Sequence, residues 1–219
     1  MPMHVRQISK VRYLSGLYER IAAVEGSVVE CGVGKGITLL ILTALALSEG
    51  KGRSVWGFDS FEGFPEPTSQ DASARMPKKG EWSGTSPEDI RLFLEKAGIS
   101  REDIGRAVTL VPGFFENSLS SYDGSPIAFL HVDVDLYESY HAVLKSLFRF
   151  VSPGGVILFD EYGDYKWPGA KKAVDAFLRG KHRHLEQEAL SGKYFIIKGA
   201  YRMMKTDISP SAEHPEGSF

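Results

Sequence analysis

The sequence predicts an α/β fold, in which a doubly wound and mostly parallel sheet ends in an antiparallel hairpin. Short apolar runs typical of buried strands recur along the chain, and helical segments lie between them. Several of these runs end in glycine or aspartate, as strands do before a turn. Strands that alternate with helices are the pattern of repeated βα units around a parallel sheet.

The strand assignments follow from composition and position. Five runs are expected to form the parallel strands, namely "GSVVECG", "SVWGFD", "AVTLVPG", "IAFLHVDVD" and "GGVILFDE". They are short and rich in Val, Ile and Phe, which suits strands that are covered on both faces. Near the end of the chain, "HLEQEAL" and "GKYFIIKGA" are expected to pair antiparallel around "SGK". Five strands and a two-stranded hairpin make a sheet of seven.

Three segments between these strands predict helices. Residues 37–47 form an apolar run of helical character, and "SPEDIRLFLEKAG" opens with Ser86 as N-cap and Pro87 at the first helical position. "KKAVDAFLRG" carries an apolar stripe and stops at Gly180. Residues 65–84 predict a long loop of the kind that often covers a site.

Composition limits the class of protein. The 219 residues, 42% of them hydrophobic, fit one domain, which we place at residues 1–204, with 205–219 expected to be a disordered tail. The formal charge of −2 gives no reason to expect a nucleic acid or a membrane as partner. Cys31 is the sole cysteine, so an intrachain disulfide is excluded. We expect a cytoplasmic protein without a signal peptide.

The run "VVECGVGKG" predicts a ligand-binding turn. Gly32, Gly34 and Gly36 follow a strand and precede an apolar helix, so the backbone can approach a ligand at the helix N-terminus. Glu30 would repel a pyrophosphate but would suit an amino group, which favours a nucleoside with a cationic tail over a dinucleotide. The alternative is a tight strand-to-helix turn that binds nothing.

Asp59, at the end of the second predicted strand, is the candidate for binding ribose hydroxyls, with Ser60 beside it. Its alternative is a strand-end cap. Phe114, after the third strand, is a candidate for stacking on an adenine, and Trp82 in the long loop is a comparable candidate. Together with the glycine turn, these residues describe an S-adenosylmethionine site better than a nicotinamide site.

Three carboxylates are expected to converge at the carboxyl ends of two neighbouring strands. Asp133 and Asp160 each end a predicted strand, and Glu161 follows directly. Three carboxylates would repel one another unless a cation held them ionised, and oxygen ligands favour Mg²⁺ or Mn²⁺ over zinc. The alternative is a set of turns and helix caps. Asp135 is instead expected to be an N-cap, with Glu138 completing a capping box.

Five stretches resemble one known family, the macrocin O-methyltransferase (TylF/MycF-type) enzymes, which use S-adenosylmethionine to methylate hydroxyls on sugars of natural products. They are "VVECGVGKG", "FDSFEGFPEP", "HVDVDLYESY", "SPGGVILFDEY" and "PGAKKAVDAF". The resemblance implies a class I methyltransferase fold with a seven-stranded Rossmann-like sheet, and a Mg²⁺ ion held by three carboxylates. By position, Asp133 and Asp160 match metal ligands, and Glu161 stands where relatives often have Asp.

The expected reaction is methyl transfer to a hydroxyl of a small molecule, a sugar or another vicinal-hydroxyl group, by a protein that forms a homo-oligomer. The base for the hydroxyl proton is Asp133, His131, Asp164 or Lys166, with a packed strand histidine as the competing interpretation of His131. Two rival classes remain open. One is a nicotinamide-dependent oxidoreductase on a similar sheet, and the other is a cofactor-binding protein without catalysis.

Overall fold

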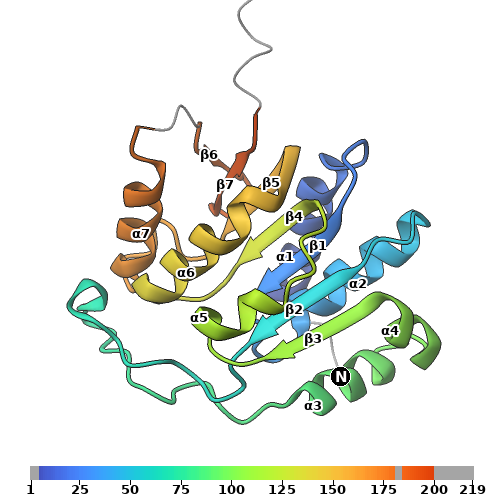
Figure 1. Ribbon diagram of the computed structural model, residues 1–219, viewed down its shortest axis with the longest axis horizontal. Helices are drawn as coiled ribbons and strands as arrows, with labels where there is room; N and C mark the ends of the chain where they lie inside the picture. The colour runs from blue at the N-terminus through green and yellow to red at the C-terminus, as the bar shows by residue number, and fades with distance from the viewer. Residues whose placement is uncertain (1–4, 181–183, 200–219) are drawn as a thin grey trace, which may run out of the picture.

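The computed structural model describes residues 5–180 and 184–199 and contains the predicted sheet. Seven strands lie in the order β3-β2-β1-β4-β5-β7-β6 (Figure 1). Their bounds are β1 Ser27–Cys31, β2 Val55–Asp59, β3 Val108–Pro112, β4 Ile127–Val132, β5 Val151–Phe159, β6 Glu186–Gln187 and β7 Tyr194–Ile197. The first five strands pair in parallel, whereas β7 pairs antiparallel with both β5 and β6. The α/β class and the closing hairpin are therefore confirmed.

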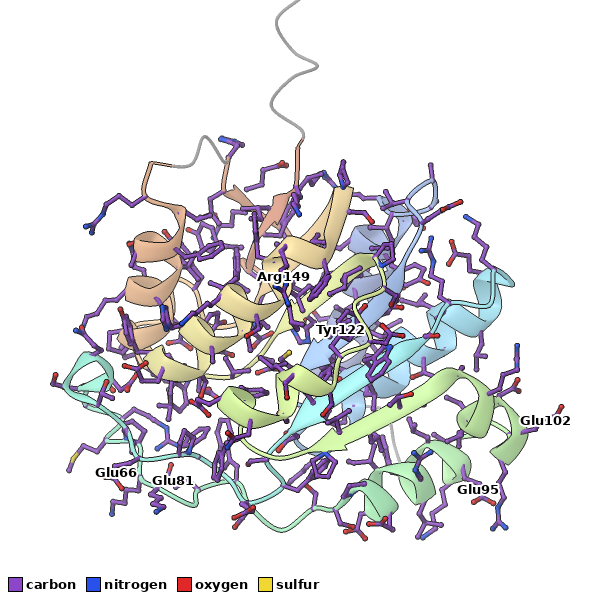
Figure 2. All side chains as sticks on the ribbon, in the orientation of Figure 1. Glu66, Glu81, Glu95, Glu102, Tyr122 and Arg149 are labelled. Carbon is purple, nitrogen blue, oxygen red and sulfur yellow. The ribbon has the colours of Figure 1, made fainter. Side chains whose placement is uncertain are left out.

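Helices cover both faces of this sheet (Figure 1). One core joins the sheet to the helices α1 Val5–Glu19, α2 Ile37–Glu49, α3 Pro87–Lys96 and α4 Arg101–Ala107. The other joins it to α5 Phe115–Ser118, α6 Tyr137–Leu147 and α7 Pro168–Leu178. Short 3₁₀ turns, η1 Ser69–Asp71, η2 Leu119–Ser121 and η3 Phe148–Phe150, complete the connections. Side chains fill both layers, while Glu95 and Glu102 lie at the outer edge of α3 and α4 (Figure 2).

Local sequence signals predict the start of α3 and the approximate end of α7. The Ser86 hydroxyl accepts a hydrogen bond from the Asp89 N–H, as expected of an N-cap, and Pro87 is the first residue of α3. Helix α7 ends at Leu178, two residues before Gly180. Helix α4, by contrast, was not anticipated, and β5 begins at Val151, earlier than the expected run.

The prediction that Asp135 caps the following helix is wrong. Helix α6 begins at Tyr137, its N-cap is Leu136, and that residue makes no side-chain cap hydrogen bond. Asp135 instead adopts a left-handed backbone with φ 60°. The capping acceptor comes from 66 residues earlier in the chain, because the Tyr137 N–H donates to Asp71 Oδ1 at 2.7 Å. The cap is thus tertiary, which a local motif cannot reveal.

Within residues 5–180 and 184–199, no helix combines the length and the apolar character needed to cross a bilayer. The proposed tail at 205–219 falls outside the described residues.

A partly buried ion pair stabilises the edge of the sheet at which the parallel strands begin, opposite their carboxyl ends. Both Glu49 carboxylate oxygens accept hydrogen bonds from the Arg53 guanidinium, which also donates to the carbonyls of Ile21 and Gly26. These contacts, with Arg53 first among them, lower the pKa of Glu49 to about 2. The guanidinium thereby joins α2 to the chain entering β1.

We expect Glu49→Gln to flatten the acid side of the stability curve. A depressed carboxyl pKa stabilises the fold fully above the unfolded value, near 4.5, and this contribution is lost as the pH falls toward 2. The unfolding free energy of the variant should therefore depend less on pH between 5 and 2, as followed by urea denaturation. Arg53→Met should destabilise by roughly 2–4 kcal/mol at pH 7 because the Glu49 carboxylate loses its partner. Parallel pH profiles for wild type and Glu49→Gln would contradict this account.

Candidate active site

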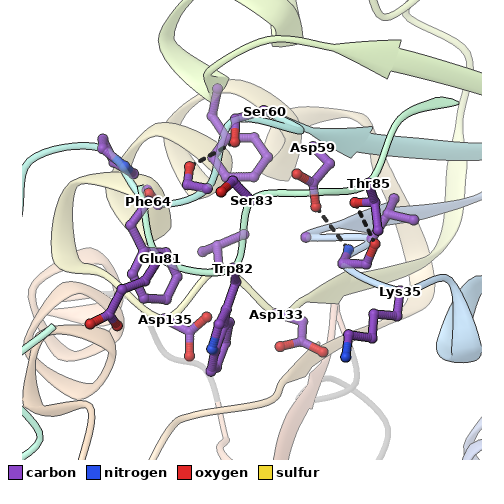
Figure 3. Close-up of a pocket in the computed structure, with 18 of the residues that line it drawn as sticks. Lys35, Asp59, Ser60, Phe64, Glu81, Trp82, Ser83, Thr85, Asp133 and Asp135 are labelled. Atoms are coloured by element: carbon purple, nitrogen blue, oxygen red, sulfur yellow. Dashed lines mark hydrogen bonds between the residues drawn. The ribbon is translucent and has the colours of Figure 1, made fainter. Parts of the chain in front are cut away.

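A cavity of about 700 Å³ opens at the carboxyl ends of the parallel strands. This is where doubly wound sheets bind ligands, because the strand order reverses between β1 and β4. Its walls come from the glycine turn after β1, the ends of β2 and β4, the start of α5, the first turn of α2, Lys10 of α1, and the long loop (Figure 3). Of the site residues expected from the sequence, these line it: Gly32, Gly34, Asp59, Ser60, Trp82, Phe114 and Asp133.

The glycine turn forms the floor between β1 and β4. Gly32, Gly34 and Gly36 all have positive φ, at 89°, 54° and 81°. A Cβ on Gly32 would lie 1.7 Å from the Asp133 carbonyl oxygen, so only glycine allows the two strand ends to meet. Gly36 is the N-cap of α2 and has no side chain to occupy the first-turn N–H groups. The turn therefore leaves helix donors near the cavity.

Asp59 holds the glycine turn in place while it faces the cavity. Its two carboxylate oxygens accept hydrogen bonds from the N–H groups of Gly34 and Phe61, each at 2.8 Å (Figure 3). A carboxylate oxygen has a second lone pair, so both can still accept a hydroxyl of a ribose. The Ser60 hydroxyl donates to the Gly63 carbonyl, which is the strand-end role considered as its alternative.

Glu30 and His131 face each other across β1 and β4 and are fully buried. Neither is among the residues that line the cavity. Glu30 Oε1 lies 3.1 Å from His131 Nδ1, and His131 Nε2 lies 3.5 Å from Asp160 Oδ1, an ion-pair distance too long for a good hydrogen bond. Burial lowers the pKa of His131, but its contacts with Asp160 and Glu30 outweigh burial and raise it to about 9. Burial also raises the pKa of Glu30, so the imidazole lies between two buried carboxyl groups, one of which resists ionisation.

Asp133, Asp160 and Glu161 converge as the sequence predicted. Each offers one carboxylate oxygen, and these oxygens lie within 4.8 Å of one another. Lys193, on the loop before β7, donates to Asp160 Oδ2 and to its carbonyl oxygen. Glu161 Oε2 accepts hydrogen bonds from the Tyr140 hydroxyl at 2.7 Å and from the Asp135 N–H at 3.3 Å. Hydrogen bonds thus hold the carboxylates of Asp160 and Glu161 in orientation.

The cluster has the donor chemistry of a divalent-cation site. Burial raises the pKa of Asp133 and of Glu161, and neighbouring carboxylates raise both further. Burial also opposes ionisation of Asp160, yet His131 and Lys193 hold its pKa well below the ordinary value. Asp160 Oδ1 is buried and has no hydrogen-bond partner within the described chain. An all-oxygen set with an orphaned buried acceptor fits Mg²⁺ or Mn²⁺.

Asp135 belongs to the cavity, a role the sequence did not suggest. Its side chain is 4% exposed and lines the cavity, and its carboxylate accepts no hydrogen bond from any residue in the described part of the chain. A left-handed backbone at a non-glycine residue costs free energy and is concentrated at functional sites. The only sequence signal for it was its position two residues after Asp133 on the strand.

The long loop closes one side of the cavity with an aromatic cluster. Trp82 packs against Phe64 and Trp167, with ring centroids 5.1 Å and 5.8 Å apart. The Arg75 guanidinium lies 4.7 Å from the Trp167 ring centroid and forms an ion pair with Glu81. The same cavity is lined by the carboxylates of Asp133 and Asp135 and by the Trp82 indole (Figure 3). The loop is therefore packed in position and builds a wall of the site.

Asp71 connects this loop to α6, and we expect its removal to be costly. It is 3% exposed and accepts hydrogen bonds from the N–H groups of Thr68 and Tyr137 and from the Thr68 hydroxyl. Asp71→Ala leaves these donors unsatisfied and should destabilise by roughly 2–4 kcal/mol. Asp89→Ala, which removes an exposed residue at the α3 cap, should cost about 1 kcal/mol or less. Urea denaturation compares the two variants, and equal shifts of their unfolding midpoints would contradict the structural role of Asp71.

Four further lining residues carried no local signal in the sequence. Lys10 reaches the cavity from α1, and Thr38 lies in the first turn of α2. Thr85 donates from the long loop to the Gly34 carbonyl at 3.1 Å, and Ser139 comes from α6. By contrast, Asp164 and Lys166, considered as bases, are exposed and lie outside the cavity lining.

These observations define the class of protein. A seven-stranded sheet with an antiparallel β7, a glycine turn after β1 and an acidic residue at the end of β2 are the features expected of a class I methyltransferase. Comparison with solved structures agrees. A calicheamicin methyltransferase matches with a TM-score of 0.78 at 26% identity over 90% of this chain and 81% of that one. The O-methyltransferase NovP matches with a TM-score of 0.74 at 26% identity, over 87% and 80%.

The chain belongs to the macrocin-O-methyltransferase (TylF) family, whose sequence pattern matches residues 9–190. One relative, the 8-demethyl-8-(2,3-dimethoxy-alpha-L-rhamnosyl)-tetracenomycin-C 4'-O-methyltransferase of Streptomyces olivaceus, is 31% identical over 80% of this chain and 64% of the relative. The demethyldecarbamoylnovobiocin O-methyltransferase of Streptomyces niveus is 30% identical over 70% and 58%. The chain thus spans less than two thirds of the length of these curated relatives.

Proposed function

We propose that the protein transfers a methyl group from S-adenosylmethionine to a hydroxyl group of a small molecule, a sugar of a natural product, with the help of a divalent cation. The relatives are named for O-methylation of tetracenomycin, novobiocin and mycinamicin compounds. The observation that carries the proposal is the convergence of three carboxylates, of which Asp133 lines the cavity beside the glycine turn while Asp160 and Glu161 lie behind it. A methyl donor and a chelated acceptor could therefore be held side by side.

The cofactor half of the cavity suits S-adenosylmethionine. Asp59 retains acceptor capacity for the ribose hydroxyls, and the turn is open at Gly34, where an added Cβ would meet no heavy atom within 4 Å. Phe114 lines the same half and offers an aromatic surface for the adenine. Glu30 is separated from the cavity by burial, so we assign it to the support of His131.

Asp133, Asp160 and Glu161 would hold the cation. A divalent cation bound there supplies Lewis acidity, which lowers the pKa of an acceptor hydroxyl and orients it. Lys193 and His131 keep Asp160 ionised and aimed at this point. The Tyr140 hydroxyl holds one oxygen of Glu161, which stands where many relatives have an aspartate.

Charge balance assigns the remaining roles. In such a transfer the hydroxyl oxygen would bond to the methyl carbon as the carbon–sulfur bond breaks, and the bonding electron pair would stay on sulfur. The hydroxyl proton would pass to the Asp133 carboxylate, because Asp133 lines the cavity whereas His131 is fully buried and does not. Asp135 and Trp82 lie on the long-loop side, and we assign them to the acceptor rather than to the cofactor. Exclusion of water by the loop favours alignment of the reacting atoms.

The test is cofactor-dependent turnover on a panel of glycosides and diols, followed by release of S-adenosylhomocysteine with and without Mg²⁺. We expect turnover that EDTA abolishes and Mg²⁺ or Mn²⁺ restores. Calorimetric titrations with S-adenosylhomocysteine and with NAD separate this proposal from an oxidoreductase. Binding of NAD alone, or cofactor binding without turnover across the panel, would count against methyl transfer.

A further inference from the structure

Helix α1 brings a positive charge to the inner end of the cofactor cavity. The Lys10 side chain lines the cavity, and its Nζ donates a hydrogen bond to the Thr38 hydroxyl at 2.7 Å. Thr38 lies in the first turn of α2, directly after the glycine turn. An ammonium group has three donors, so Lys10 has capacity for a further acceptor.

A second polar group lies on the same face of α1, buried behind the cavity lining. Tyr13 follows Lys10 by three residues and therefore shares its helix face. Its hydroxyl is buried and has no hydrogen-bond partner among the described residues. Burial raises the pKa of Tyr13, and the charges of Asp160 and Asp133 raise it further, which locates the hydroxyl near the acidic end of the site. A buried hydroxyl without a partner indicates that a ligand group completes the site.

The chemistry of the cofactor supplies a matching group. Its methionine part carries an ammonium and a carboxylate. The carboxylates of Asp133 and its neighbours suit the ammonium but would repel the carboxylate. The cavity is lined by two lysines, and Lys35 is exposed on the glycine turn, whereas Lys10 is partly buried and held against Thr38. The first-turn N–H groups of α2 also favour an anion at this point.

We propose that α1 is part of the cofactor site and that Lys10, positioned by Thr38, binds the carboxylate of the methionine part. The inference rests on the proposed function, because it requires that the cavity binds S-adenosylmethionine. It gives the N-terminal helix a role beyond packing: the helix closes over the amino-acid end of the cofactor, and the Tyr13 hydroxyl provides a second contact there.

Isothermal titration of the full chain with S-adenosylhomocysteine and with 5′-methylthioadenosine tests this inference without turnover. The second ligand shares the adenosine and the sulfur but lacks the amino-acid part. Lys10→Met should lower the affinity for S-adenosylhomocysteine by about ten- to a hundredfold, the usual range for a charge-assisted hydrogen bond. The affinity of the same variant for 5′-methylthioadenosine should stay within about twofold of the wild-type value. Thr38→Val and Tyr13→Phe should show the same pattern with smaller losses.

Lys35→Met is the matched control, since it removes the other lysine of the cavity, and its loss should be several times smaller. Thermal unfolding of each variant checks that the fold is retained. Equal losses for both ligands, or none for S-adenosylhomocysteine, would overturn the role of Lys10 and leave the proposed function standing. If the wild-type protein bound neither ligand, the proposed function itself would fail, so the two failures are distinguishable.

Discussion

Asp133→Asn is expected to reduce methyl transfer by about a hundredfold or more while leaving the fold intact or more stable. Asp133 directly follows β4 and lines the cavity, and in the proposed reaction it is both a cation ligand and the proton acceptor. Burial and the Asp160 charge raise its pKa, so the ionised carboxylate is held at a cost to stability in the absence of a cation. A neutral amide of the same shape removes that repulsion together with the function.

Two measurements on the same variant test this expectation. One is the rate of S-adenosylhomocysteine release at saturating Mg²⁺, and the other is the unfolding temperature in EDTA and in Mg²⁺. Wild type should be stabilised by Mg²⁺, and Asp133→Asn should respond much less. Asp164→Asn, an exposed aspartate outside the cavity, is the control and should behave as wild type. Near-normal turnover in Asp133→Asn would remove this residue from the reaction.

Gly32→Ala is expected to be among the most destabilising substitutions in the chain, at roughly 4 kcal/mol or more. The new Cβ would lie 1.7 Å from the Asp133 carbonyl oxygen, and φ at this position is 89°. The obstacle is backbone on a neighbouring strand, so no change of side-chain rotamer relieves it. Since β1 and β4 would have to separate at this point, Asp133 would also move away from the glycine turn.

Gly34→Ala is the matched control for that substitution. This glycine also has positive φ, 54°, but a Cβ there would meet no heavy atom within 4 Å. Only the left-handed backbone is penalised, at about 1–2 kcal/mol. Urea denaturation and the yield of soluble protein compare the two variants directly. Similar losses in both would show that strand contact at Gly32 matters less than backbone conformation.

Much of the fold could be predicted from the sequence because its signals are local. The apolar runs, the glycine turn and the Ser86 cap each depend on neighbouring residues, and β1 to β5, α2 and α3 confirm them. Helix α4 was missed, and the start of helix α6 was predicted wrongly. Its "DLYE" motif satisfied the local rule, yet the cap comes from Asp71, and the left-handed backbone frees Asp135 to face the cavity. A tertiary contact displaced the local one.

The candidate site was predictable in part for the same reason. Asp133, Asp160 and Glu161 end adjacent strands, and the topology of a parallel sheet is enough to bring them together. Lys193 and Lys10 were not predictable, because they come from the far ends of the chain and reach the site only when β7 and α1 pack on the sheet. Burial of Glu30 with His131 likewise depends on the register of β1 against β4. Charge partners of this kind have no pattern along the chain.

A structure of the protein with S-adenosylhomocysteine and Mn²⁺, with the ion located by its anomalous scattering, tests the central proposal most directly. We expect one ion in contact with Asp133, Asp160 and Glu161, with open positions facing the long loop and Asp135. We also expect Lys193 to stay on the second oxygen of Asp160. Ordered cofactor with no ion at the three carboxylates, or an ion bound elsewhere, would contradict metal-assisted methyl transfer by this site.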